Sequence, residues 1–308
     1  MVTKDLEYYV SKFKALNVNR SGGHASPHKP SMLLAVLELA ESGHLLENKI
    51  PFDDVLLTRY AAYFEIVRSE RDHLNPWMPY FHLRKDGFWH HEPRPGREAI
   101  LFSKNSARKR KDVVENIDHV HLDAELHRLM RNADQRHLLR ELLVSDWFPG
   151  YQEQLYKLAR IAEEEEKILN EPLKNLREAS SLQPSRSAAF RRIVTEAYGF
   201  RCAATGWRVV LPDYSVLVEA AHIIPFSETQ DDRPQNGIAL TPNFHWAMDR
   251  GIIAPGPDLK WHVSNSLDDR IADNEPLVAI NGRALILPKD PRFRPAPDSL
   301  EWRLTQLR

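Results

Sequence analysis

The chain has 308 residues, of which 42% are hydrophobic and 28% are charged, and its formal net charge at pH 7 is −1. This balance is typical of folded domains and excludes a disordered chain, and the length allows two domains with separate cores. The single cysteine, Cys202, excludes an internal disulfide and any zinc site built from several cysteines.

The chain has no sequence signal for a membrane. Its apolar runs stay well short of the roughly 20 residues that a membrane span needs. The N-terminal stretch MVTKDLEYYVSKF has the pattern of an amphipathic helix and lacks the apolar centre of a secretory leader. We therefore expect a cytoplasmic protein without a membrane partner.

The first half of the sequence predicts a mainly helical domain. Apolar side chains at helical spacing predict helices over 3–17, 31–43, 53–68 and 123–145. Residues 73–91 alternate proline and Asp-Gly with aromatic residues, which predicts a loop that leads into a small hairpin. A basic run lies at residues 103–112.

A charged stretch divides the chain. Residues 151–182 are rich in charge, including the acidic run at 163–166, and we expect a solvated helical linker. This linker would separate an N-terminal domain, 1–150, from a C-terminal domain, 183–308. The second domain begins with a helix near 187–199 and continues into short strands near 208–224 and 236–241. The predicted fold class is therefore α+β.

Four polar residues stand at informative intervals in the second domain. His222 ends an apolar strand, Asn236 follows fourteen residues later, and His245 follows nine after that. Thr241-Pro242 predicts a helix start, which places His245 and Asp249 one turn apart on one face. An imidazole and a carboxylate so placed can grip a divalent cation. A base and a cation are the set that phosphodiester cleavage needs, although a lone histidine at a strand end is often structural.

These residues carry a resemblance to a known family. The stretches RCAATG (201–206), EAAHIIPF (219–226) and NGIALTPNFHWAMDRG (236–251) resemble the HNH endonucleases of the ββα-metal fold. The resemblance covers roughly residues 186–256. It implies that His222 is the general base, that Asn236 braces the loop that carries the base, and that His245 and Asp249 bind Mg²⁺ or Mn²⁺.

The sequence departs from this family at one position. Many HNH enzymes carry a metal-binding Asp or His directly before the base, and here that position is Ala221. Glu219 is the candidate replacement, and the sequence leaves open whether it takes this role.

The first half resembles a second family. The stretches RSGGHASPHKPSMLLAVLELAESG (20–43) and NPWMPYFHLRKDGFW (75–89) are similar to the sulfur-binding domain of phosphorothioate-dependent restriction endonucleases. That family joins this domain to an HNH nuclease, and the resemblance spans most of residues 5–150. It departs at Met78, where the family commonly has tyrosine.

A pocket that selects sulfur over oxygen needs an apolar contact point with cations around it, because sulfur is larger, more polarisable and more weakly hydrated than oxygen. The candidate apolar contacts come from NPWMPYF and the candidate cations and donors from the preceding loop, and the resemblance implies further DNA contacts in the basic run. The apolar contacts are Met78, Pro79 and Tyr80. The cations and donors are Arg20, His28 and Lys29, and the further DNA contacts are Lys104 and Asn105. The alternative is that these stretches are a packed turn and a helix start.

Together the two halves predict a restriction endonuclease that binds phosphorothioated double-stranded DNA and hydrolyses nearby phosphodiesters. We expect a homodimer, because one active site cuts one strand. One alternative is a nuclease that depends on methylated or otherwise modified bases. Such a base would leave the duplex and stack on Trp77, Phe81 or Trp89. The other alternative is a DNA-binding protein without catalysis.

Overall fold

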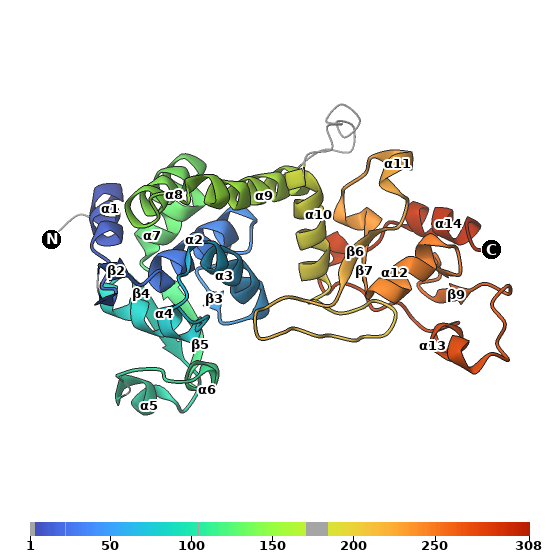
Figure 1. Cartoon of the computed structure of the whole chain (residues 1–308), viewed down its shortest axis with the longest axis horizontal. Coiled ribbons are helices and arrows are strands. Elements are labelled where there is room, and N and C mark those ends of the chain that lie inside the picture. Colours follow the sequence, from blue (N-terminus) through green and yellow to red (C-terminus); the bar gives the residue numbers. More distant parts are fainter. Residues whose placement is uncertain (1–3, 22, 104, 171–183) are drawn as a thin grey trace. The chain divides into compact units, whose positions relative to one another are not determined.

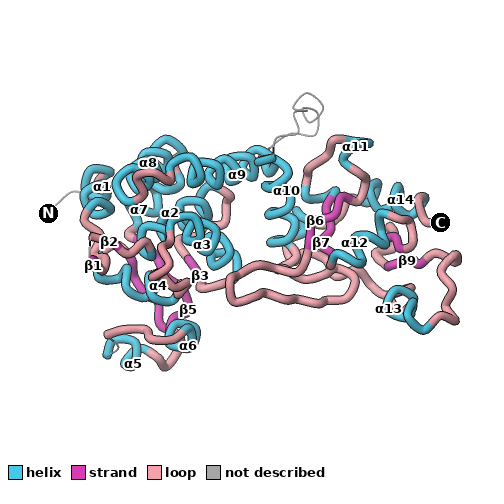
Figure 2. Tube along the Cα trace, viewed as in Figure 1, coloured by secondary structure: helices cyan, strands magenta, loops and turns pink. Residues whose placement is uncertain are grey.

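The computed structural model describes residues 4–21, 23–103, 105–170 and 184–308. The chain forms two compact units, Met1–Glu166 and Lys167–Arg308. Helices predominate in the described ranges and the strands are short (Figure 2), which confirms the α+β class. Within these ranges, every helix is too short or too polar to cross a lipid bilayer.

The first unit is built around one buried helix (Figure 1). That helix, α2 (His28–Glu41), is buried on all sides, since every residue from Lys29 to Leu39 is buried. Helices packed around α2 close the core. They include α3 (Asp54–Val67), α7 (Ala124–Arg131) and α8 (Ala133–Trp147), and α1 (Leu6–Lys14) packs on α7 and α8. The predicted helix at 123–145 is therefore two helices, because Asn132 ends the first and caps Gln135 N–H at the start of the second.

Small sheets lie beside these helices. The strands β3 (Ile50–Pro51), β5 (Ile117–Leu122) and β4 (Trp89–Pro93) form one antiparallel sheet in that order. A separate hairpin joins β1 (Arg20–Ser21) to β2 (His24–Ala25). Two short helices, α5 (Glu98–Ser103) and α6 (Arg110–Val114), connect β4 to β5.

The stretch at 73–91 differs from the predicted loop and hairpin. Residues Trp77–His82 form a helix, α4, and a 3₁₀ turn at Leu83–Asp86 leads through Gly87, which has φ 88°, to β4. A proline in the first turn of a helix removes no internal hydrogen bond, so Pro79 does not interrupt α4. β4 pairs with the distant β5 instead of a neighbouring strand, and local turn signals cannot reveal such a partner.

The helix α9 (Gln152–Asn170) also differs from the predicted solvated linker. One face of α9 is buried through Leu155, Ala159 and Ala162, so the first unit extends to Glu166 instead of ending near residue 150. The acidic run is not uniformly solvated either. Glu165 is fully buried and lies 3.1 Å from the guanidinium of Arg59 on α3. Residues 171–182 of the expected linker lie outside the described ranges.

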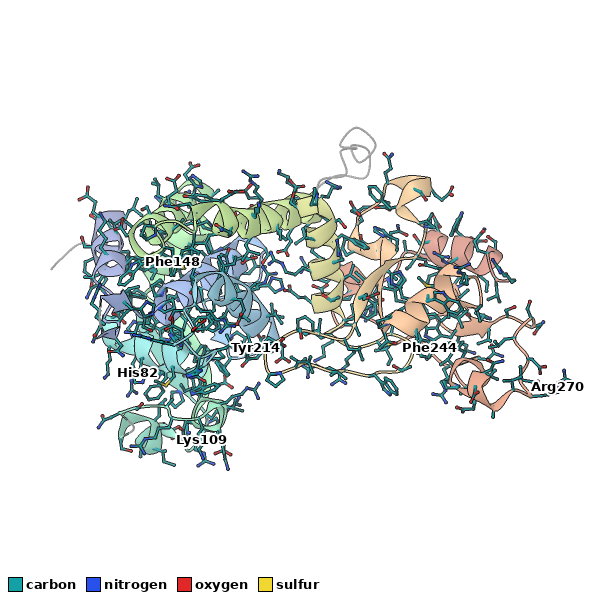
Figure 3. All side chains as sticks on the ribbon, in the orientation of Figure 1. His82, Lys109, Phe148, Tyr214, Phe244 and Arg270 are labelled. Carbon is teal, nitrogen blue, oxygen red and sulfur yellow. The ribbon has the colours of Figure 1, made fainter. Side chains whose placement is uncertain are left out.

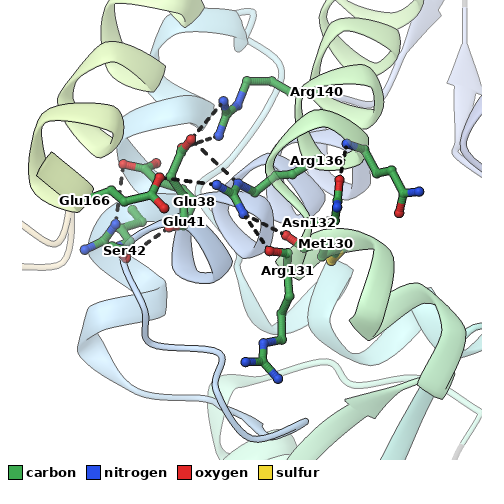
Figure 4. Close-up of polar contacts among 11 residues, drawn as sticks. Glu38, Glu41, Ser42, Met130, Arg131, Asn132, Arg136, Arg140 and Glu166 are labelled. Carbon is green, nitrogen blue, oxygen red and sulfur yellow. Dashed lines mark hydrogen bonds and ion pairs between the residues drawn. The ribbon is translucent and has the colours of Figure 1, made fainter. Parts of the chain in front are cut away.

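The pair of Arg59 and Glu165 belongs to a group of buried charges at the end of α2. Arg59 also lies 3.5 Å from Glu38, and Arg140 on α8 bonds Glu41 (Figure 4). Arg136 is 3.6 Å from Glu41 and 3.4 Å from Glu166. Buried charges are tolerated only with opposite charges and hydrogen bonds around them, so this group fixes how α2, α3, α8 and α9 pack together.

The second unit places two short antiparallel strands between helices. The strand β6 (Glu219–His222) pairs with β7 (Gly237–Leu240), and α10 (Pro184–Ala197) packs on both. The helix α12 (Pro242–Asp249) follows β7 and contacts both strands. Further elements complete the unit: α11 (Phe226–Thr229), β8 (Ile253–Pro255), β9 (Trp261–Val263), α13 (Glu275–Val278) and α14 (Pro297–Thr305), with 3₁₀ turns at Pro234–Asn236, Ala272–Asn274 and Pro291–Phe293.

A buried histidine in the first unit should make the stability of this unit sensitive to acid. Burial lowers the pKa of His91 on β4 from 6.5 to about 4, and its Nδ1 has no hydrogen-bond partner among the described residues. The unfolded chain therefore binds more protons than the folded chain between these pH values. We expect the free energy of unfolding to fall as the pH drops from about 6.5 to about 4, by up to roughly 3 kcal/mol.

The variant His91→Gln cannot take up this proton and should flatten the dependence. Urea unfolding of the full chain across this pH range, with hydrogen exchange of β4 and β5, measures the effect. The matched control is His137→Gln, at an exposed position on α8. An equal acid dependence in wild type and His91→Gln would contradict the prediction.

Candidate functional site

The strand, loop, strand and helix predicted for residues 219–249 are all present in the second unit. His222 is the last residue of β6 and lies opposite Gly237 on β7. A Cβ at Gly237 would be 2.4 Å from Val194 Cγ2 on α10, so only glycine lets that helix approach the strands so closely. His245 lies in α12, which begins at Pro242 as the Thr-Pro signal predicts.

The side chain of His222 is held on two sides. Its Nε2 lies 2.9 Å from Oδ1 of Asp232, and the other oxygen of that carboxylate accepts a hydrogen bond from Arg186 Nε at 3.0 Å. The ring stacks on Phe190 with 3.9 Å between centroids and 8° between planes. The side chain keeps 23% of its surface exposed, so the ring is fixed in place yet reachable from solvent.

Asn236 ties down the loop that follows His222. The side chain of Asn236 is buried, accepts a hydrogen bond from Ile224 N–H at 2.9 Å and donates one to the Ile224 carbonyl at 2.9 Å. Its own backbone carbonyl accepts from Ile223 N–H at 2.8 Å. Asn236 thus binds the backbone directly after His222 through both its side-chain amide and its backbone carbonyl.

His245 stands between two carboxylates. Its Nδ1 is 3.0 Å from Glu219 Oε2 on β6, and its Nε2 is 3.4 Å from Asp249 Oδ2 one turn along α12. The structure therefore brings Glu219, His245 and Asp249 together. The hydrogen-bond partners of the His222 ring and of the His245 ring are different residues, Asp232 for the first and Glu219 for the second.

The imidazole of His245 and the two carboxylates beside it are the candidate ligands of the expected Mg²⁺ or Mn²⁺ ion. Carboxylate oxygen suits Mg²⁺ and Mn²⁺, and neutral imidazole nitrogen is a common ligand of divalent metal ions. The described residues contain no group of three or more His, Cys, Asp or Glu side chains arranged to hold a metal ion. Since Mg²⁺ commonly takes one or two protein carboxylates and completes its shell with phosphate and water, the residues fit a cation shared with substrate and do not form a closed cage.

Sequence reasoning missed two residues that hold His222. Asp232 is nearly fully buried, and its only sequence signal is its place in the loop between His222 and Asn236. Arg303 on α14 is also buried, and its guanidinium donates to the carbonyls of Ile223 at 2.6 Å, His222 at 3.2 Å and Met248 at 3.4 Å. Nothing near Arg303 in the sequence points to the site, which lies some 80 residues earlier.

A pocket of about 530 Å³ in the first unit gathers several of the predicted DNA-reading residues. This first-unit pocket is lined by residues of three segments, 17–29, 71–79 and 82–85, and includes His28, Lys29, Met78 and Pro79. Met78 and Pro79 lie in the first turn of α4, and His82 ends that helix (Figure 3). The pocket wall formed by α4 is therefore partly apolar.

The predicted cations of this pocket are engaged internally. Lys29 is buried and bonds Asp86 at 2.6 Å. His28 bonds Ser26 Oγ at 2.8 Å through Nδ1 and the His73 carbonyl at 2.9 Å through Nε2, and burial lowers its pKa. Burial and then repulsion from Lys85 lower the pKa of His82 as well. Arg71 and Lys85, which sequence reasoning missed, are the exposed cations that line the pocket.

The remaining predicted DNA-reading residues lie elsewhere. Arg20 lines a different pocket of about 630 Å³, where its guanidinium is 5.4 Å from the ring of Trp147. Tyr80 is fully buried and donates its hydroxyl hydrogen to the Ile50 carbonyl on β3 at 2.7 Å. It is therefore a core residue and does not line the first-unit pocket. Asn105 is exposed in the loop before α6, and Lys104 lies outside the described residues.

Residues 202–254 match the HNH endonuclease family model. No curated protein matches the chain. Among solved structures, the chain is similar to the sulfur binding domain of SprMcrA complexed with phosphorothioated DNA, at 17% identity and a TM-score of 0.39, over 53% of this chain and 99% of that one. It is also similar to the modification dependent TagI restriction endonuclease, at 24% identity and a TM-score of 0.30, over 44% of each chain.

The bonds of Asn236 predict a measurable cost of removing its amide. Asn236→Ala deletes three side-chain hydrogen bonds, two to Ile224 and one to the Asp231 carbonyl at 3.0 Å, and leaves both polar groups of Ile224 without that partner. We expect the free energy of unfolding of the second unit to fall by roughly 2–3 kcal/mol, with faster hydrogen exchange of residues 222–226. The control is Asn281→Ala, an exposed amide with one bond, to Val263 N–H. Equal effects of the two variants would contradict this role.

Proposed function

We propose that this chain is a modification-dependent DNA endonuclease, with its nuclease centre in the HNH segment at residues 202–254. One observation carries the nuclease proposal: within this segment His222 is anchored at the end of β6, and His245 on α12 stands between the carboxylates of Glu219 and Asp249. A fixed imidazole base and a cation site are the two parts that phosphodiester hydrolysis requires.

In this mechanism His222 is the general base. Its ring takes a proton from water, the water oxygen forms a bond to phosphorus, and the bond from phosphorus to the leaving oxygen breaks. Asn236 and Arg303 hold the backbone of residues 222–224, so the ring keeps its position during the proton transfer. His245 and Asp249, with Glu219 beside them, would hold Mg²⁺ or Mn²⁺, which supplies charge stabilisation at the phosphate when bound.

The proposed DNA mark is a phosphorothioate, and the first-unit pocket is its proposed site. Met78 and Pro79 offer a soft apolar surface, where a weakly hydrated sulfur loses less solvation than an oxygen would. Arg71 and Lys85 offer positive charge for the rest of the phosphate. The pocket thus combines an apolar contact with cations, which is the combination that a sulfur-bearing anion requires.

A mark carried on a base is less well supported by the positions of the aromatic residues. Phe81 and Trp89 are fully buried, and Trp89 donates its Nε1–H to the Tyr80 carbonyl at 2.8 Å. Neither ring can stack an extruded base without opening the core, which leaves the half-buried Trp77. Competition binding with sulfur-modified, methylated and plain duplexes of one sequence separates the two marks, and we expect the sulfur-modified duplex to bind most tightly.

A duplex cut needs a break in each strand, and one chain offers one proposed active site. We therefore expect two copies of the chain to act together on double-stranded DNA. Sedimentation of the protein with a modified duplex tests this stoichiometry.

Cleavage of DNA tests the proposed nuclease activity. Wild type should cut phosphorothioated DNA and spare plain DNA when Mg²⁺ or Mn²⁺ is present, and EDTA should stop the reaction. His222→Ala removes the proposed base and should reduce the rate by about 10²-fold or more, with DNA binding retained. Digestion of both DNAs by both proteins, side by side, provides the measurement. If wild type and His222→Ala prove equally inert, the chain is a DNA-binding protein without catalysis.

The affinities of sulfur-modified and plain duplexes test the proposed sulfur site. Met78→Gln places an amide at the apolar contact, so the ratio of affinities for sulfur-modified and plain duplex should fall by about tenfold. Lys85→Gln is the matched control, since loss of a phosphate contact should weaken both duplexes equally and reduce the salt slope by about 1. Titration of both duplexes at several salt concentrations measures both effects. An unchanged ratio in Met78→Gln would exclude this pocket as the sulfur site.

A further inference from the structure

We propose that Asp232, held by Arg186, is a positioning residue that fixes the protonation pattern of His222. This inference rests on the proposed role of His222 as the base. The family match covers residues 202–254, so Arg186 and the helix that carries it lie outside the matched segment. The proposal therefore extends the catalytic apparatus to α10.

The contacts place a buried carboxylate behind the ring. Asp232 is 3% exposed, its Oδ1 lies 2.9 Å from His222 Nε2, and its Oδ2 accepts from Arg186 Nε at 3.0 Å. Arg186 is itself buried. A buried carboxylate that contacts both a histidine and an arginine is costly to form, so it indicates a specific arrangement.

The chemistry of these atoms selects one form of the imidazole. A carboxylate only accepts hydrogen bonds, so in the neutral ring the proton must lie on Nε2 and the lone pair on Nδ1. A general base needs its lone pair at the atom that meets the water. Asp232 thereby makes Nδ1 the proton acceptor, and its negative charge stabilises the imidazolium that forms.

The helix α10 also fixes the plane of the ring. Phe190 lies four residues after Arg186, so both side chains project from one face of α10. Phe190 stacks on the His222 ring at 3.9 Å, and Phe226 flanks the ring at 5.7 Å. One helix face therefore supplies both the surface that orients the ring and the cation that orients its carboxylate.

Arg186 makes the substitution Asp232→Asn informative. The Arg186 Nε–H can only donate, so the amide oxygen of an asparagine at 232 must face Arg186 and its NH₂ must face His222. His222 Nε2 must then accept, which moves the ring proton to Nδ1 and blocks the proposed base. A residue of nearly equal shape thus reverses the pattern.

The experiment combines kinetics and nitrogen NMR on the full chain. For Asp232→Asn we expect kcat on phosphorothioated DNA to fall by about 10²- to 10⁴-fold, with KM within about threefold of wild type. The ¹⁵N imidazole spectrum, assigned with His222→Gln, should show the proton on Nε2 in wild type and on Nδ1 in Asp232→Asn. The matched control is Asp231→Asn, whose carboxylate pairs with Arg233 in the same loop and should leave both readouts unchanged.

Several outcomes would overturn the proposal. Wild-type kcat in Asp232→Asn would do so, and so would lost activity with the His222 spectrum unchanged. The wild-type spectrum is decisive even if Asp232→Asn does not fold, because a proton on Nδ1 in the folded wild type contradicts the assignment directly. Failure of wild type to cut any modified DNA would contradict the proposed function instead. The NMR spectrum would still report on the contact between Asp232 and His222.

Discussion

The backbone where β6 ends is the constraint on which the candidate site depends. At residues 222–224 the chain leaves the small sheet, so its polar backbone groups lose their ladder partners and must be bonded in another way. Asn236 satisfies Ile224 on both sides, and Arg303 caps the carbonyls of His222 and Ile223. Because the same guanidinium reaches Met248 on α12, it also ties the end of the strand to the helix that carries His245.

Local sequence patterns predict the secondary-structure elements of the candidate site better than those of the rest of the chain. His222, Asn236, His245 and Asp249 are local enough that strand, turn and helix signals place them on the right elements. Asp232 and Arg303 lack such signals, since an acidic loop residue and a lone arginine on a distant helix are ordinary features of a surface. Their burial follows from tertiary packing, which periodicity does not report.

The first unit shows the same limit in its charged residues. Lys29 and His28 read as candidate anion contacts, but Asp86 and the Ser26 and His73 groups engage them inside the fold. Composition cannot reveal that a basic side chain already has a buried partner. The exposed cations of the pocket, Arg71 and Lys85, come from segments whose sequence suggests only turns. The apolar residues Met78 and Pro79 lie on a helix. The sequence does not predict this helix, because prolines flank Trp77 and Met78 on both sides.

The burial of Glu165 decides where the first unit can be separated from the rest of the chain. A fragment that stopped near residue 150 would expose the surface that Leu155, Ala159 and Ala162 cover, and it would strip from Arg59 the carboxylate 3.1 Å away inside the core. An autonomous piece must keep α9 through Glu166. The part of the predicted linker that runs from Gln152 to Glu166 is therefore an integral helix of the unit it follows.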